Sequence, residues 1–315
     1  MSNNEQCRSH LHAVRRHAAK AALASAADPA NASASSSSSA VTRSGPDNYS
    51  AFEYIFRGAF GKVFKALGPA GEPVAIKIVD IFQANMPDSV PEIGLFQLIA
   101  MEYCPSDLDR LIRENYLTFE EVTWYMSQIC DGVAYVHGHQ VVHRDLKPAN
   151  ILLTAEDVVK IADFGAARQI CSQRVMERGV GTTWYCAPEL IDLKYKGSYT
   201  FTSTLADMWS VGCILAEMMS NRPLLNAERP EEVLTQMASL DNDGSIETWL
   251  AQETETCVLR ASIPWSLTQW DYACTCLLER LVAFDPEERL SARDARDVFL
   301  KPIDAGVTAD EPLAG

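Results

Sequence analysis

The residues best suited to do chemistry lie in two short segments near the middle of the chain, "VVHRDLKPANILL" (141–153) and "IADFGAA" (161–167). Within them, Asp145, Asn150 and Asp163 offer hard oxygen atoms of the kind that bind Mg²⁺. Lys147 stands two residues after Asp145, and Lys77 ends the strand-like segment "VAIK" (74–77). Metal-holding oxygens and fixed cations are what the transfer of a phosphoryl group requires.

Two further segments extend this pattern, "RGAFGKV" (57–63) upstream and "WYCAPEL" (184–190) downstream. Each of the five segments would be a weak signal alone, but all five in this order are very specific. The chain therefore resembles eukaryotic protein kinases over roughly residues 49–300. The resemblance implies an α+β fold with two lobes: a small, mostly antiparallel β lobe (49–103) and a larger helical lobe (104–300).

The resemblance also implies a role for each residue of the central segments. Asp145 matches the catalytic base, and Asn150 and Asp163 match the Mg²⁺ ligands. Lys147 matches the lysine that contacts the γ-phosphate in serine/threonine kinases, so the expected acceptor is Ser or Thr. Thr182 matches the threonine that bridges the catalytic aspartate and lysine. The neighbouring His143 is interpreted as a packing and hydrogen-bonding residue.

An ATP site follows from the same resemblance. Lys77 is expected to bind the α- and β-phosphates, and Asp107 to lie near the ribose. The first of the family's three loop glycines is replaced by Phe56, which predicts weaker binding without loss of it. The full predicted set is Ile55, Gly58, Gly61, Val63, Ala75, Lys77, Glu102, Cys104 and Asp107.

The segment before Thr182 departs from the family's pattern. Glu177 stands where many relatives carry a phosphorylated threonine, and Arg144 and Arg168 are two of the three arginines that would hold the phosphate. One carboxylate facing two guanidiniums is a reasonable charge match, so the segment is expected to be ordered without phosphorylation at that position. An exposed glutamate with no role is the alternative.

Two matches in the larger lobe concern structure and specificity. Glu189 and Arg289 match a buried ion pair of the family. "GCILAEMMSNRPLLNAERPEEVLTQM" and "FDPEERLSARDA" are similar to cyclin-dependent kinases and their relatives. Cys186 replaces an arginine of that group, which puts a preference for proline after the acceptor in doubt.

The stretch "SVPEIGLFQLIAMEYC" (89–104) fuses two elements that the family separates. Residues 89–97 align with the family's C helix, with Glu92 as the partner of Lys77, and residues 98–104 align with the strand that enters the hinge. By the resemblance, on the order of 20 residues that normally separate the two elements are missing, and the fused stretch is far shorter than ordinary connections between elements allow. Pro91 and Gly94 would leave a short, weak helix. A mis-joined exon and a real shortened lobe both explain these facts.

Helical periodicity dominates the larger lobe. Thr118 and Glu121 have the spacing of a capping box. On the helix that follows, one apolar face is formed by Val122, Tyr125, Ile129, Val133 and Val136. Residues 206–219 are apolar nearly all round and predict a central helix. Residues 1–48, rich in Ala and Ser, and residues 301–315 are expected to be tails.

Composition narrows the partners. The 315 residues carry a net charge of −15, with a local +3 in residues 1–45, so nucleic acid and anionic membranes are not expected as partners. Nine scattered cysteines indicate buried thiols in a reducing compartment, and no apolar run is long enough to span a membrane. A cytoplasmic or nuclear location is expected, with a basic organelle-targeting N-terminus as the alternative.

Three functions compete. An active protein serine/threonine kinase using ATP and Mg²⁺ is supported by the complete set of Lys77, Asp145, Lys147, Asn150 and Asp163. A pseudokinase acting as a binding or scaffold module draws on the lost glycine and the shortened region around Glu92. A small-molecule kinase is disfavoured because the 184–190 segment serves protein substrates. Protein substrates are the expected partners, and a cyclin is a weaker expectation because the C helix is where this chain departs most.

Overall fold

The structure of the 315-residue chain is a computed structural model that describes residues 48–58, 61–80, 96–170, 183–191, 203–240, 246, 248–249 and 276–300. The chain divides into two compact units. The first holds the described residues up to Pro105 together with Thr154–Asp157, and the second holds Ser106–Leu153 and the described residues from Val158 onward. The division lies two residues beyond the expected boundary at 103. The predicted tails lie almost wholly outside the described residues.

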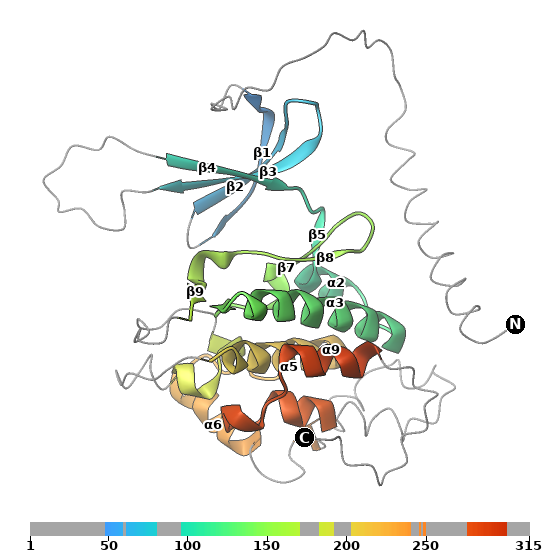
Figure 1. The fold of residues 1–315 in the computed structure, drawn as a ribbon, viewed down its shortest axis with the longest axis vertical. Helices are drawn as coiled ribbons and strands as arrows, with labels where there is room; N and C mark the ends of the chain where they lie inside the picture. The colour runs from blue at the N-terminus through green and yellow to red at the C-terminus, as the bar shows by residue number, and fades with distance from the viewer. Residues whose placement is uncertain are drawn as a thin grey trace, which may run out of the picture. The chain divides into compact units, whose positions relative to one another are not determined.

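An antiparallel sheet of four strands forms the first unit (Figure 1). Its order is β1-β2-β3-β4, each strand pairing with its neighbour along the chain. Gly71, with a φ of 82°, allows the turn between β2 and β3. The strands are β1 Ser50–Gly58, β2 Gly61–Leu67, β3 Pro73–Asp80 and β4 Phe96–Glu102.

Strand β4 corrects one expectation from the sequence. Phe96 and Gln97, assigned above to a helix, belong to the strand and pair with Asp80 and Val79 of β3. Pairing with β3 satisfies the backbone groups of two residues that precede the strand expected at 98–104. The sequence could not show this, because the periodicity of a short apolar run does not distinguish helix from strand. Glu92 and the rest of residues 81–95 lie outside the described residues.

The second unit is mostly helical and contains the large core. The α-helices whose two ends are both described are α2 Leu108–Glu114, α3 Phe119–Gly138, α5 Leu205–Ser220, α6 Pro230–Leu240 and α9 Ala292–Leu300. Short strands make two small sheets: β5 Ser106–Asp107, β7 Ile151–Leu153 and β8 Val159–Ile161 in one, and β6 Val141–Val142 and β9 Arg168–Gln169 in the other. Short 3₁₀ turns are η2 Pro148–Asn150, η3 Phe164–Ala166, η4 Thr183–Tyr185 and η6 Pro286–Glu288.

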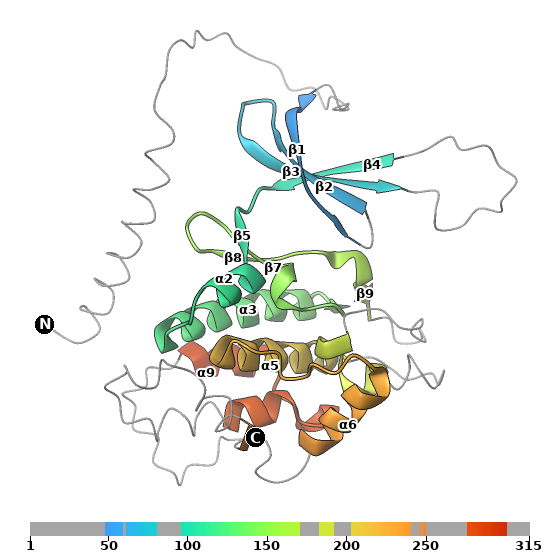
Figure 2. The ribbon, with the colours of Figure 1, turned by 180° about the vertical axis from the view of Figure 1, so that it is seen from behind.

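The two longest helices confirm their sequence predictions. The capping box of Thr118 and Glu121 starts α3, with both reciprocal hydrogen bonds formed. Four of the five predicted apolar residues on its face are buried, and Val136 near its end is half-buried. Helix α5 is buried along nearly all of its length, as expected for a central helix, and α9 packs along α3 (Figure 2).

Candidate active site

The segment that contains Asp145 is closed by hydrogen bonds among its own side chains. Lys147 Nζ donates to Asp145 Oδ2 at 2.9 Å. Asn150 Nδ2 donates to the Asp145 carbonyl oxygen at 2.7 Å and to Asp145 Oδ2 at 3.2 Å. Pro148 at the start of η2 fixes the backbone between these residues. Three predicted functional residues are therefore brought together by local structure.

Asp163 is held beside this segment by a backbone ladder. Ile151 of β7 pairs with Ile161 of β8, and the amide of Ala162 donates to the carbonyl oxygen of Asn150 at 2.9 Å. Asp163 itself has left-handed dihedral angles of 61° and 61°, which are unusual for a residue other than glycine. Backbone strain of this kind is concentrated at functional sites.

His143 connects the two segments through both of its ring nitrogens. Its Nε2 lies 2.9 Å from the Ala162 carbonyl oxygen, and its Nδ1 faces the amide of Asp145 at 3.3 Å. The ring packs edge-on against Phe164, with centroids 4.8 Å apart. This geometry requires a proton on Nε2 and confirms the interpretation of a packing and hydrogen-bonding residue.

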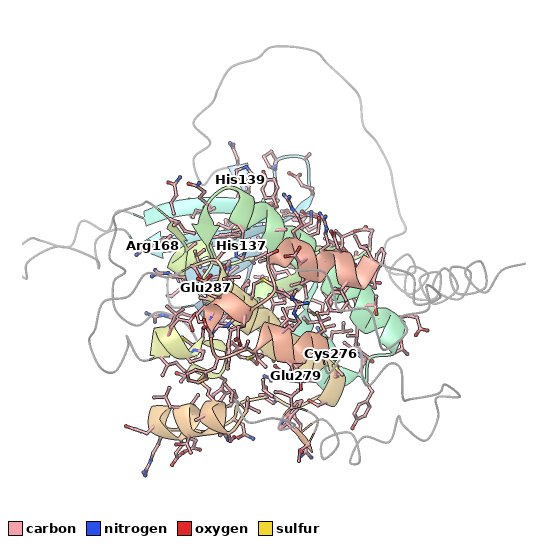
Figure 3. The ribbon with its side chains drawn as sticks, turned by 60° about the horizontal axis from the view of Figure 1, so that its bottom comes forward. His137, His139, Arg168, Cys276, Glu279 and Glu287 are labelled. Carbon is pink, nitrogen blue, oxygen red and sulfur yellow. The ribbon has the colours of Figure 1, made fainter. Side chains whose placement is uncertain are left out.

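Asp207 of α5 holds the backbone that leads into Asp145, and sequence reasoning missed it. Its Oδ1 accepts from the Arg144 amide at 2.8 Å, and its Oδ2 accepts from the His143 amide at 2.8 Å and from His137 Nε2 at 2.9 Å. His137, labelled in Figure 3, comes from the last turn of α3. Asp207 is 1% exposed. Its signal was a carboxylate in the first turn of a mostly apolar helix.

The two arginines predicted to bind Glu177 lie near the same segments. Arg144 is buried, has a φ of 69°, and its Nε donates to the Ala166 carbonyl oxygen at 2.7 Å. Arg168 is exposed and its backbone pairs with Val142, joining β9 to β6. Glu177 and Thr182 lie outside the described residues, so their expected roles remain predictions.

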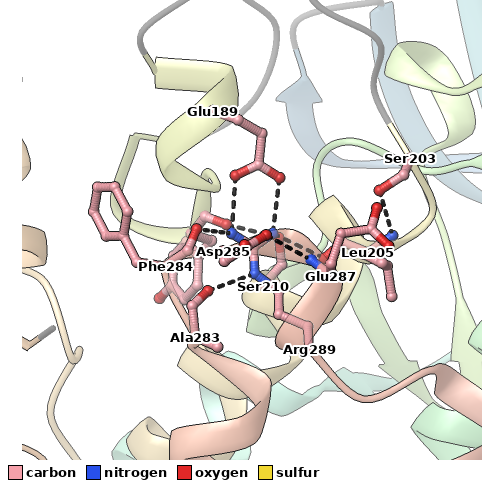
Figure 4. Close-up of polar contacts among 10 residues, drawn as sticks. Glu189, Ser203, Leu205, Ser210, Ala283, Phe284, Asp285, Glu287 and Arg289 are labelled. Atoms are coloured by element: carbon pink, nitrogen blue, oxygen red, sulfur yellow. Dashed lines mark hydrogen bonds and ion pairs between the residues drawn. The ribbon is translucent and has the colours of Figure 1, made fainter.

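Glu189 and Arg289 form the ion pair that the sequence predicted (Figure 4). The contact is bidentate, with Arg289 Nη1 2.7 Å from Glu189 Oε1 and Nη2 2.9 Å from Oε2. Arg289 also donates to three backbone carbonyl oxygens and lies over the ring of Trp209. Its side chain is 0% exposed. Such full pairing is what allows a guanidinium to be buried.

Three of the predicted nucleotide-binding residues of the first unit share a sheet face. Val63, Lys77 and Ile99 are opposite one another on β2, β3 and β4, and two residues along are Ala75 and Met101. Because side chains alternate across a strand, Val63, Ala75 and Lys77 point to the same side.

The remaining predicted nucleotide-binding residues lie at other places in the two units. A Cβ atom at Gly61 would collide with the Ile78 carbonyl oxygen, so this position requires glycine. Ile55 and Gly58 are on β1, and Cys104 follows β4. Glu102 is on β4 and points to the face of the sheet opposite the one that carries Lys77. Asp107, in the second unit, caps α2 by accepting from the Arg110 amide at 2.8 Å.

Comparisons with known proteins agree with this geometry. The family model described as "Protein kinase domain" matches residues 96–299. The chain is 30% identical over 292 positions to cyclin-dependent kinase 20 of Danio rerio, covering 79% of this chain and 82% of the relative. It is also 30% identical over 314 positions to mitogen-activated protein kinase 2 of Pneumocystis carinii, covering 85% and 86%.

The chain belongs to the protein kinase domain family. It is an ATP-dependent protein serine/threonine kinase, similar to the cyclin-dependent kinases, with the predicted two-lobed α+β architecture of a strand-rich and a helical part. Nothing in these findings favours the pseudokinase alternative. Among the described residues, no helix is long and apolar enough to cross a membrane.

Proposed function

We propose that Asp145 is the base that accepts the proton of the substrate hydroxyl and that Lys147 neutralises charge on the transferred phosphoryl group. The observation that carries this proposal is the closed cluster of Asp145, Lys147 and Asn150, with the ammonium of Lys147 2.9 Å from the Asp145 carboxylate. Because these contacts hold the carboxylate in one orientation, it is already in place when the substrate hydroxyl binds. Such positioning lowers the activation free energy of the transfer. Lys77 would bind the α- and β-phosphates of ATP.

We propose Asn150 and Asp163 as the residues that hold Mg²⁺. The amide nitrogen of Asn150 is directed at Asp145, which leaves its Oδ1 for another partner. An amide oxygen and a carboxylate suit this ion, and the remaining ligands of its octahedron would come from phosphate and water. The ion would supply neutralisation of the phosphate charge. The chain itself holds the backbone of Asn150 beside the backbone that leads into Asp163 through the Ala162–Asn150 hydrogen bond.

Phosphate transfer from γ-labelled ATP to a generic protein substrate tests both proposals. We expect incorporation on Ser and Thr that depends on added Mg²⁺. Asp145→Asn should lower kcat by at least about 100-fold, since a positioned base contributes about 10²–10⁴. Asp285→Asn, at an exposed turn in the described part of the second unit, is the matched control. Equal rates for wild type and Asp145→Asn would contradict the assignment.

A cyclin-type activator is a separate proposal, supported by the similarity to cyclin-dependent kinase 20. It predicts that the purified chain alone transfers phosphate much more slowly than the same chain with a bound activator. Full activity of the chain alone would contradict it. Rates measured on peptides with Pro or with Ala after the acceptor residue would show whether this chain, with Cys186, prefers proline at that position.

A further inference from the structure

Strand β4 is the last strand of its sheet, and no described strand lies beyond it (Figures 1 and 2). Its pairing with β3 is continuous over seven residues, from Asp80 with Phe96 to Val74 with Glu102, with no register shift. An edge strand offers backbone N–H and C=O groups along its outer side to any other strand. The outer edge of β4, Phe96–Glu102, is called the β4 edge below.

The β4 edge lacks the features by which edge strands usually avoid pairing. Its sequence, "FQLIAME", contains no Lys, Arg, Pro or Gly, and its single charge is Glu102 at the end. Charged side chains, proline and bulges are the usual protection. Three large apolar side chains stay open on the strand: Leu98 is 41% exposed, Ile99 37% and Met101 41%.

The opposite edge of the same sheet is protected. Strand β1 has register shifts between Ser50 and Glu53 and between Tyr54 and Phe56. Ala51 has a φ of 53°, a conformation that interrupts a regular strand. Glu53 and Arg57 place charges of both signs along it. Since β1 has these protective features and the β4 edge lacks them, we expect a strand from another molecule to pair with β4 and not with β1.

The sequence of the β4 edge complements itself. In an antiparallel pair centred on Ile99, Ile99 faces the partner's Ile99, Leu98 faces the partner's Ala100, and Glu102 faces the partner's Phe96. No two like charges are opposite each other, and apolar pairs fill the middle of the ladder. The described residues of 48–105 carry four basic and four acidic side chains, so this part of the chain does not repel a second copy.

We propose that a second copy of this chain docks on the β4 edge, forming a two-fold antiparallel pair that joins two four-stranded sheets into one of eight strands. Main-chain hydrogen bonds between the two copies supply the attraction, and the apolar side chains of Leu98, Ile99 and Met101 fix the register. The contact is isologous and closes at two copies, because each sheet offers one unprotected edge.

The size of the contact sets its expected strength. Seven residues on each copy make a small interface, below the roughly 1,200 Å² of a standard stable complex. A dissociation constant of about 10 to 50 µM is therefore expected, and the dimer should appear only as the concentration rises.

Sedimentation velocity of the full chain from about 1 to about 200 µM tests the proposal. Wild type should pass from monomer to dimer across this range. Leu98→Lys and Leu98→Glu each place two like charges diagonally across the two-fold axis, so each variant alone should dimerise about tenfold more weakly. An equimolar mixture of the two variants should recover dimers. A misfolded variant would not recover on mixing, so folding failure is distinguished from loss of the contact.

Tyr54→Lys is the matched control, because Tyr54 is an exposed apolar residue on the protected β1 edge. It should dimerise like wild type. A wild-type chain that remains monomeric up to about 200 µM would overturn the proposal. Leu98 variants that dimerise like wild type, or that fail to recover when mixed, would overturn it as well.

Discussion

At the scale of single residues, the candidate site depends on a buried carboxylate outside the cluster of Asp145, Lys147 and Asn150. Asp207 holds the amides of His143 and Arg144 with two different oxygens, and His137 shares one of them. Arg144 has a positive φ, so this turn would relax without a partner that fixes both amides. The position of Asp145 is therefore determined in part by a residue 62 positions further along the chain.

Asp207→Asn should damage both stability and catalysis. The amide keeps the shape but turns one acceptor into a donor, which leaves a buried N–H facing another N–H. We expect a loss of about 1–3 kcal/mol in the free energy of unfolding, measured by denaturant titration. We also expect kcat to fall more than the KM for ATP rises. Asp131→Asn, at an exposed partner of Arg296, should change the free energy of unfolding by less than about 0.5 kcal/mol. An Asp207→Asn variant with the unfolding free energy and kcat of wild type would show that Asp207 does not position the Asp145 segment.

Glu217 makes stability depend on pH. It is buried on α5 and accepts a hydrogen bond from the Tyr185 hydroxyl at 2.7 Å. Burial raises the pKa of Glu217 above 4.5, Asp109 raises this pKa further, and the hydrogen bond and Arg113 oppose the rise. The folded chain therefore keeps a proton that the unfolded chain has already lost. The stabilisation that this bound proton gives the folded chain is complete below pH 4.5, and it is lost as the pH rises through the pKa of Glu217 in the folded chain.

Glu217→Gln removes this dependence because a glutamine cannot ionise. The unfolding free energy of the variant minus that of wild type should increase from about pH 4.5 upward, by about 1.4 kcal/mol for each unit by which the native pKa is raised. Denaturant titrations at half-unit pH steps measure it. A flat difference for Glu217→Gln would show that the carboxyl is not perturbed.

At the scale of elements, one asparagine joins two helix ends. Asn221 ends α5 with a φ of 57°, and its backbone amide donates to the Glu217 carbonyl oxygen. Its side-chain nitrogen donates to the carbonyl oxygens of Ile112 and Asn115, at 2.7 and 2.8 Å, at the end of α2. Carbonyl groups at helix ends have no partner within the helix, so Asn221 satisfies groups of both helices.

Two substitutions separate the contributions of Asn221. Asn221→Gly keeps the left-handed conformation but loses both side-chain hydrogen bonds, so the free energy of unfolding should fall by about 1–3 kcal/mol. Asn221→Ala loses the same bonds and adds the cost of a Cβ atom at positive φ, about 1 kcal/mol more. Urea titration of both variants measures the difference. A glycine variant as stable as wild type would show that the link between the helices carries little energy.

At the scale of the whole molecule, local signals could be predicted and distant ones could not. The capping box of α3 depends on residues three apart, and the Asp145 segment folds on itself, so both were predictable from the sequence. The Asp207 network joins residues more than 60 positions apart, and only the fold brings them together. The start of β4 was misplaced by two residues, because its partner Asp80 decides whether Phe96 is in a strand.

The rate at which a cysteine is alkylated should report how deeply its thiol is buried. Cys130 and Cys213 lie inside the helical core, and burial raises the pKa of the Cys130 thiol to about 12 and also raises that of Cys213. Since the thiolate is the form that reacts, neither should be alkylated near pH 7 while the core is closed. Cys104 and Cys276 are half-exposed and have no such protection.

The labelling rates of Cys130 and Cys213 should therefore report opening of the helical core. Iodoacetamide labelling followed peptide by peptide in a mass spectrometer should modify Cys104 and Cys276 first, and Cys130 and Cys213 much later. If the core opens as one cooperative unit, Cys130 and Cys213 should react at a common rate that rises together with denaturant. Labelling of Cys130 as fast as Cys104 would mean that the core around α3 opens independently of α5.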